Sequence, residues 1–278
     1  MTVCPKRIGT IFGLVLLSLV IVGGPILSQE NPSRTYRLNA QFLKDLKNDF
    51  VSVWTAPLKW PDRDWTKFAV ALGATGLIYV GDDGIHEWSQ SNRNTSGDDF
   101  WNFVSRFGEP VVLLGVSGGI YAAGEIVGST GMRRTALLSI ESLLISSTML
   151  YALKWAVGRA RPYAEEGKSS FHPLSLESKY HSFPSGHTSA AFSVASVIAH
   201  HSDSLIVDVL SYSLATFVGF ARPFQDKHWA SDVFFGAALG YFVGQKICAC
   251  HTSQPSKSID VGLQITPHHQ SLTLSFSF

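Results

Sequence analysis

Three polar clusters interrupt an otherwise apolar part of the chain, and they decide how the whole sequence is interpreted. The first is KWAVGRARP at residues 154–162, the second is PSGH at 184–187, and the third is ARPFQDKHWASD at 221–232. Together they hold basic side chains, a hydroxyl, two histidines and a carboxylate. Such groups bind an oxyanion and carry protons to and from it. The apolar segments around them have the length of helices.

The first two clusters predict an anion-binding site. Lys154 and Arg161 are seven positions apart, about two helical turns, so both are expected on one face near the end of a helix that Pro162 stops. Ser185 is suited to cap the next helix, and Gly186 lets a ligand approach the backbone N–H groups at its start. The N-terminus of a helix attracts anions.

The third cluster adds groups for covalent chemistry. His228 and Asp232 are four positions apart, so on a helix Asp232 accepts from one imidazole nitrogen and leaves the other free as a nucleophile. Arg222 presents a planar fork of donors to phosphate oxygens. The combined set predicts phosphoryl transfer without a metal or other cofactor.

In order and spacing, the clusters resemble the signature motifs of the type-2 phosphatidic acid phosphatase and vanadium haloperoxidase superfamily. The family patterns are Lys-x6-Arg-Pro, Pro-Ser-Gly-His and Ser-Arg-x5-His-x3-Asp, and the chain departs from them only at Ala221, where the family has Ser. The departure removes one possible phosphate donor or helix contact. The resemblance implies that His228 forms a phosphohistidine, oriented by Asp232, and that His187 protonates the leaving oxygen and then activates water. It also implies a set of phosphate-binding residues: Lys154, Arg161, Ser185, Gly186 and Arg222.

Each cluster residue taken alone has a simpler explanation, and the coincidence of all of them favours a site. A basic residue at a helix end is commonly a solvated cap or a membrane-interface anchor, and a His–Asp pair four apart is commonly structural. Asp82 and Asp83 have no further ligand at metal spacing and are interpreted as a loop or helix cap. Several histidines outside the clusters are predicted to be surface or loop residues: His172, His181, His200, His201, His251, His268 and His269.

The predicted fold is all-α, a bundle of about six apolar helices with the site at one end. The motifs follow one helix, precede the next and lie between the last two, so they converge at one end of the bundle. The apolar segments are residues 68–80, 110–127, 136–157, 188–199, 205–220 and 233–248. After residue 258, apolar and polar residues alternate in two short runs, which predicts a C-terminal β-hairpin packed on the bundle.

Four parts are expected along the chain. Residues 1–28 resemble a signal peptide or an N-terminal anchor, since Lys6 and Arg7 precede an apolar run. Residues 29–64 form a polar, Trp-containing arm, residues 65–250 the phosphatase helical domain, and residues 251–278 a linker and the hairpin. The export segment places the chain after residue 28 outside the cytoplasm, so the expected location is the bacterial cell envelope, with the site facing the periplasm or exterior.

We favour a bundle attached to the membrane. Charges within the apolar runs are costly in lipid, so a bundle that lies on the membrane surface or is soluble in the periplasm is an alternative. These charges are Glu125, Glu141 and Asp208. The formal net charge of +1 gives no nucleic-acid signal. Cys248 and Cys250 are too close for an easy bridge, so no disulfide framework is expected.

The function expected from these observations and the resemblance is metal-independent hydrolysis of a lipid phosphate or pyrophosphate, of the phosphatidic acid, polyprenyl pyrophosphate or lipid A type. One alternative is a vanadium-dependent haloperoxidase, which would bind vanadate with a similar set of residues; the export segment and long apolar helices favour the lipid enzyme. The other is a catalytically idle envelope protein that binds a partner through its hairpin and Trp-rich arm.

Overall fold

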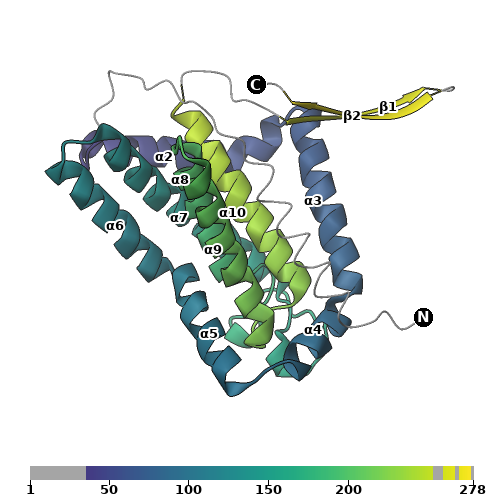
Figure 1. The fold of residues 1–278 in the computed structure, drawn as a ribbon. Helices are drawn as coiled ribbons and strands as arrows, with labels where there is room; N and C mark the ends of the chain where they lie inside the picture. The colour runs from purple at the N-terminus through teal and green to yellow at the C-terminus, as the bar shows by residue number, and fades with distance from the viewer. Residues whose placement is uncertain (1–35, 253–258, 267–268, 277–278) are drawn as a thin grey trace.

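A computed structural model describes residues 36–252, 259–266 and 269–276 of the 278-residue chain (Figure 1). The predicted signal peptide or anchor lies outside the described residues. The described part is predominantly helical, which confirms the all-α prediction. Its α-helices are α2 Ala40–Thr55, α3 Asp62–Val80, α4 Asp82–Ser91, α5 Thr95–Ser105, α6 Pro110–Ile126, α7 Thr130–Val157, α8 Gly186–His200, α9 Leu205–Phe224 and α10 Ala230–Cys250.

Helix α8 is the centre of the bundle and packs against α7, α9 and α10. Most of its residues are buried alanines, serines and other small or apolar residues. Two of the serine hydroxyls are satisfied within the helix, since Ser193 donates to the carbonyl of Ala190 (2.9 Å) and Ser196 to that of Phe192 (2.9 Å). Because these serines bond to their own helix, they can be buried without a polar partner on a neighbouring helix.

Glycines bring α10 into close contact with α8. Gly236, Gly240 and Gly244 recur every fourth residue and share one face of α10. A Cβ atom at any of them would overlap α8 or its start, at the Ser185 backbone for Gly236 and at the Ser189 carbonyl for Gly240. Small residues spaced in this way allow helix backbones to approach closely. The contact places the beginning of α8 directly against the beginning of α10, where two of the three motifs lie.

Two bends close the end of the bundle that carries the motifs. Helices α3 and α4 meet at 58°, and α5 with the short turn after it meets α6 at 58°. Figure 1 shows α4 and α5 at the end where α9 finishes and α10 begins. Helix α4 contacts both α9 and α10, and α5 contacts α9. The bends therefore bring polar residues of α4 and α5 next to the motifs, which the sequence patterns did not predict.

The bundle has features of a membrane-embedded protein. Helices α7, α9 and α10 are long and apolar enough to cross a membrane, and each bent pair passes the same test when taken as one segment. Helix α9 exposes an apolar stripe of Ile206, Leu210, Leu214 and Phe217, which share one helix face. An extended exposed apolar surface of this kind marks a membrane or protein contact.

Each of the three charges that left a soluble bundle open is either buried or paired. Glu141 and Asp208 are buried within the bundle, and Glu125 lies 3.8 Å from Arg133 at the end of α6. None of the three therefore lies alone on a lipid-facing surface. The side of the membrane that the site faces stays a prediction.

The polar arm packs on the bundle, and the tail contains two strands. Helix α2 packs on α7 and α10, with Val53 and Leu46 in the apolar contact. Strands β1 (Ile259–Thr266) and β2 (His269–Phe276) pair antiparallel, with Thr266 opposite His269. That these strands form a stable hairpin packed on the bundle stays a prediction, as do the boundaries of the four parts.

Candidate active site

The three motifs meet at one end of the bundle. Lys154 is in the last turn of α7, Arg222 is in the last turn of α9, and Asp232 is in the first turn of α10. The prediction that Arg161 shares the helix face of Lys154 is wrong. Gly158 adopts a left-handed conformation (φ 61°) that ends α7, so Arg161 lies in an extended segment beyond the helix.

Side chains of the first and third motifs donate hydrogen bonds to two backbone carbonyls, those of His181 and Ser182. The Lys154 ammonium donates to the His181 carbonyl and, at 3.5 Å, to that of Ser182. Arg161 also donates to the His181 carbonyl (3.5 Å), and His228 Nδ1 donates to the Ser182 carbonyl (2.7 Å). The segment that precedes the second motif therefore joins the other two, a role that no sequence pattern indicated.

His228 has its predicted tautomer but a different hydrogen-bond partner. It precedes α10, whose N-cap is Trp229, so the assumption that His228 and Asp232 share a helix is wrong. Nδ1 lies 3.8 Å from Asp232 Oδ2 and bonds to the Ser182 carbonyl instead. Because a carbonyl only accepts, Nδ1 carries the proton and Nε2 keeps its lone pair. Asp232 accepts from the Ser182 hydroxyl and so fixes the peptide that orients His228.

A buried ion-pair group lies behind Asp232. Arg159 Nη1 is 2.6 Å from Asp232 Oδ1, and Nη2 is 2.8 Å from Asp82 Oδ2. Ser231 adds donors, since its hydroxyl and backbone N–H both bond to Asp82. Burial opposes the charge of Arg159, but the two carboxylates outweigh it and raise its pKa. The side chains of Asp82 and Asp232 have no exposed surface and that of Arg159 is 2% exposed.

Sequence patterns alone did not predict this group. They indicated a loop or cap role for Asp82 and no role for Arg159, which stands inside the first motif. Asp82 does begin α4, but its carboxylate reaches residues almost eighty and one hundred and fifty positions away. The sequence did contain one signal for this group, namely Arg159 itself. A buried arginine requires a carboxylate partner.

Burial and neighbouring cations keep both site histidines neutral. The pKa of His187 is lowered to about 3, first by burial and then by Arg222, Arg161 and Lys154. Burial and the same cations lower the pKa of His228 well below its usual value. Burial also lowers the pKa of Arg161. Without an anion, the site is thus a cluster of cations around two uncharged imidazoles, an arrangement that favours binding of a phosphate.

The second motif deviates in detail from its predicted role. Ser185 is the N-cap of α8, but its hydroxyl pairs with that of Thr188 (2.9 Å) and makes no hydrogen bond to a backbone N–H. Its backbone N–H donates to the carbonyl of Asp232 (2.9 Å). Gly186 begins α8 beside the side chain of Lys154, at 3.9 Å from where its Cβ would lie. The start of α8 therefore faces the lysine of the first motif.

Arg222 is held by residues outside its own motif. Its Nη1 donates to the hydroxyl of Ser105 on α5 (2.6 Å) and to the side-chain amide oxygen Oε1 of Gln225 (2.5 Å). Ala221 is fully buried, so the family serine at this position would have been enclosed in the bundle. The Ser105 hydroxyl thus accepts a hydrogen bond from Arg222, and no sequence pattern around Ser105 indicated this contact.

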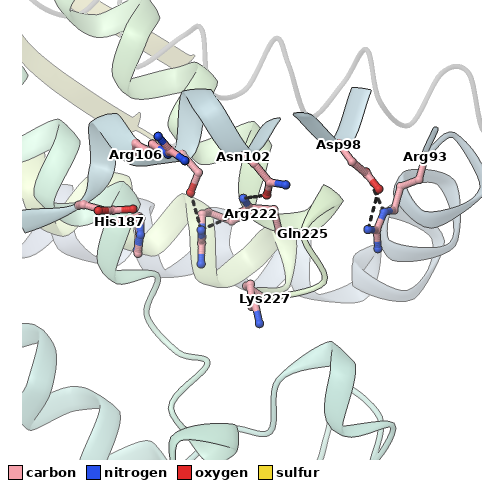
Figure 2. A pocket seen from close by; sticks show the side chains of 10 residues that line it. Arg93, Asp98, Asn102, Arg106, His187, Arg222, Gln225 and Lys227 are labelled. Atoms are coloured by element: carbon pink, nitrogen blue, oxygen red, sulfur yellow. Dashed lines mark hydrogen bonds and ion pairs between the residues drawn. The ribbon is translucent and has the colours of Figure 1, made fainter. Parts of the chain in front are cut away.

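A polar pocket of about 370 Å³ opens beside Arg222 and His187 (Figure 2). Its rim carries the Arg93–Asp98 ion pair (2.9 Å) and a hydrogen bond from Gln225 to Asn102 (2.7 Å). The full lining consists of Arg93, Asp98, Asn102, Ser105, Arg106, Glu109, His187, Arg222, Gln225 and Lys227. Its charged and amide groups suit the polar head of a phosphate ester.

Several histidines outside the motifs are not surface residues. His200 and His251 are buried, at 5% and 7% exposure, which corrects the prediction for both. His181 Nε2 donates to the Ser175 carbonyl (2.8 Å), and His172 bonds to Glu166 (2.9 Å) in the loop after the first motif. His268 lies outside the described residues. Clustering of buried histidines cannot be recognised from the sequence when no spacing pattern marks it.

Known proteins resemble the part of the chain that carries the motifs. Residues 135–255 match the model of the PAP2 superfamily. A lipid A 1-phosphatase of Porphyromonas gingivalis is 37% identical over 99 residues, which cover 35% of this chain and 19% of that protein. A lipid A 1-phosphatase of Rhizobium johnstonii is 35% identical over 103 residues, covering 36% of this chain and 41% of that protein. The chain thus spans less than half the length of these curated relatives.

Two crystal structures share the fold. LpxE of Aquifex aeolicus superposes with a TM-score of 0.50 at 21% identity, covering 60% of this chain and 94% of that chain. A transmembrane PAP2-type phosphatidylglycerolphosphate phosphatase from Bacillus subtilis superposes with a TM-score of 0.54 at 22% identity, covering 68% of this chain and 96% of that chain. At this identity the likeness concerns the fold alone.

Proposed function

We propose that the protein is a lipid phosphate phosphatase that works through a phosphohistidine, on the premise that residues 135–255, which match the model of the PAP2 superfamily, make it a member of that superfamily. One observation carries the proposal. His228 keeps the Nε2 lone pair while its ring is within electrostatic reach of Lys154, Arg161 and Arg222. A neutral nucleophile beside fixed cations suits attack on a phosphate anion.

In the first step, His228 Nε2 attacks phosphorus and the bond to the leaving oxygen breaks. The ring becomes an imidazolium, which the Ser182 carbonyl holds at Nδ1 and the nearby Asp232 carboxylate stabilises. His187 donates a proton to the leaving oxygen. A bound phosphate offsets the cations that lower the pKa of His187, so substrate binding itself favours the protonated form that this step needs.

In the second step, water attacks the phosphohistidine and neutral His187 accepts the proton of that water. The phosphorus–nitrogen bond breaks, and inorganic phosphate and neutral His228 are released. Charge on the equatorial oxygens is compensated throughout by Lys154, Arg161 and Arg222, with the Gly186 N–H and Ser185 hydroxyl as further donors. No metal or other cofactor takes part in this scheme.

The substrate is a lipid phosphate or pyrophosphate, of the lipid A, phosphatidic acid or polyprenyl pyrophosphate type. The exposed apolar stripe of α9 keeps the bundle in lipid, and the polar pocket takes the head group. We place the site on the outer face of the membrane of the cell envelope. Arg133 and Arg134 begin α7 at the end opposite Lys154, and basic loops tend to stay on the cytoplasmic side.

The test is phosphate release from a panel of lipid A, phosphatidic acid, a polyprenyl pyrophosphate and a soluble monoester, with a metal chelator present. The wild type is expected to hydrolyse at least one lipid, and His228→Ala is expected to lose turnover while retaining the helical circular dichroism of the parent. His172→Ala, a partly exposed histidine outside the motifs, is the matched control and is expected to turn over normally.

Base-quenched reactions with the turned-over lipid, followed by mass spectrometry, are expected to find phosphate on the peptide that contains His228. Turnover by His228→Ala at the parent rate would refute the nucleophile. Halide oxidation with added vanadate, in the absence of any lipid turnover, would favour the haloperoxidase instead.

A further inference from the structure

A second cluster of chemically reactive side chains lies at the opposite end of the bundle. His200 ends α8, His201 follows it, and Cys248 is in the last turn of α10. Cys248 and Asp232 are 16 positions apart on α10, which places the cluster about 24 Å from the phosphatase site. Figure 1 shows these ends of α8 and α10 away from α4 and α5.

The three side chains are close enough to share one ion. One ring nitrogen of each histidine and the Cys248 sulfur all lie within 4.8 Å of one another. Cys248 is a fully buried free thiol and His200 is 5% exposed, while His201 is partly exposed.

The hydrogen bonds orient the rings as ligands. His201 Nδ1 donates to the Val197 carbonyl (2.9 Å), so the proton is on Nδ1 and Nε2 has a lone pair. Within the described part of the chain, Nε2 of His201 has no hydrogen-bond partner, and neither nitrogen of His200 has one of good geometry, although Gln245 lies beside that ring. Metal-ligating histidines usually donate their other N–H to a carbonyl in this manner.

A buried polar atom without a partner requires an explanation, and one explanation is that the atom binds an ion. The positive charge of Arg134 acts on the cluster and disfavours a further positive charge there, but a Cys248 thiolate removes one charge from a bound ion. Glu141 belongs to a neighbouring group of side chains that also contains Asp49 and His251.

We propose that His200, His201 and Cys248 bind a thiolate-preferring closed-shell ion, Zn²⁺ or Cu⁺. Two imidazoles and a thiolate are ligands that both ions accept, while Mg²⁺ and Ca²⁺ require oxygen ligands. Binding releases the thiol proton to solvent and joins the C-terminal ends of α8 and α10. The ion stabilises the fold and takes no part in phosphate release.

The test uses the purified full-length protein in detergent, stripped with a chelator and then titrated with Co²⁺ as a spectroscopic stand-in for Zn²⁺. The expected result is about one bound ion per chain with a thiolate-to-cobalt charge-transfer band. Cys248→Ser is expected to lose the band, and His201→Gln to weaken binding at least tenfold. Cys250→Ser, two positions away and outside the cluster, is the matched control and is expected to keep the band.

A second arm distinguishes the ions. Zn²⁺ competition against Co²⁺ and Cu⁺ competition against a chromophoric chelator under reducing conditions measure each affinity, and the tighter ion is expected to raise the melting temperature of the wild type but not of His201→Gln. Absence of stoichiometric binding by Co²⁺, Zn²⁺ and Cu⁺ would overturn the proposal. A band that is lost in Cys250→Ser and kept in Cys248→Ser would also overturn it.

Discussion

At the scale of single residues, the orientation of His228, the proposed nucleophile, depends on a peptide group rather than on a direct carboxylate contact. The Ser182 carbonyl accepts from His228, and the Ser182 hydroxyl donates to Asp232, which Arg159 and Asp82 hold in turn. Removal of one partner from a buried ion pair leaves the other charge uncompensated. A change at Asp82 is therefore expected to affect the orientation of His228 through Arg159, Asp232 and Ser182.

Asp82→Asn is expected to reduce the free energy of unfolding by about 3 kcal/mol, because half of the buried compensation for Arg159 is lost. Thermal unfolding in detergent measures the loss. The neighbouring Asp83 is exposed and pairs with Lys168 (2.8 Å), so Asp83→Asn is the matched control and is expected to change stability by less than about 1 kcal/mol. Equal effects of the two substitutions would contradict the role assigned to Asp82.

The protonation of His228 gives a further prediction. Burial and neighbouring cations lower its pKa, so the ring is expected to remain neutral, with the proton on Nδ1, when the pH falls from 8 to about 5. An ordinary histidine with a pKa near 6.5 would gain a proton over that range. Histidine ¹⁵N chemical shifts measure the change, with His228→Ala used to assign the signal. A His228 midpoint near 6.5 in the substrate-free protein would show that the cations do not act on it.

At the scale of elements, the site depends on the distance between α8 and α10. The three glycines of α10 let its first turn contact the N-cap of α8, and the Ser185 N–H then bonds to the Asp232 carbonyl. A larger residue at these positions would separate the second motif from the third. The glycines thus have a functional consequence although they touch no substrate.

Gly240→Ala is expected to destabilise the protein by about 2 kcal/mol, because the new methyl group would overlap the backbone carbonyl of Ser189, which cannot rotate away. Gly119→Ala on α6 is the control, since open space surrounds that position. It is expected to be neutral or stabilising by up to about 1 kcal/mol, as alanine favours a helix over glycine. Melting curves of both variants test the contact, and a neutral Gly240→Ala would exclude it.

At the scale of the whole molecule, the exposed surface determines how the bundle sits in lipid. Leu210 is 64% exposed at the middle of the α9 stripe, whereas Asp99 is an exposed residue of α5 near the site. In a bilayer, an apolar helix surface faces the hydrocarbon and the polar end lies in water. The exposed residues of the α9 stripe therefore leave apolar surface that the described bundle does not cover.

A nitroxide label at Leu210→Cys is expected to be more accessible to oxygen than to a water-soluble nickel complex in proteoliposomes, because oxygen concentrates in the hydrocarbon. A label at Asp99→Cys is expected to show the reverse order. Both labels are introduced into a chain whose native cysteines are replaced by serine. Greater nickel accessibility at Leu210 would refute the membrane-embedded bundle and restore the peripheral one.

The sequence by itself determined the class of fold, the three motifs and their convergence at one end of a bundle, because helix periodicity and motif spacing are local properties of the chain. It also indicated the free nitrogen of His228, although it assigned the wrong acceptor. Gly158 ended the helix earlier than the spacing of Lys154 and Arg161 implied, since a left-handed residue overrides an apparent shared helix face.

Only the tertiary structure decided which distant residues complete the site. Asp82, Ser105, Arg159 and Ser182 reach the motifs through the bends and close helix contacts of the bundle. The cluster of His200, His201 and Cys248 likewise forms only when two helices finish side by side. No periodic sequence pattern predicts either arrangement. Burial of a charge or of a metal ligand depends on which surfaces pack together and not on the spacing within any one segment.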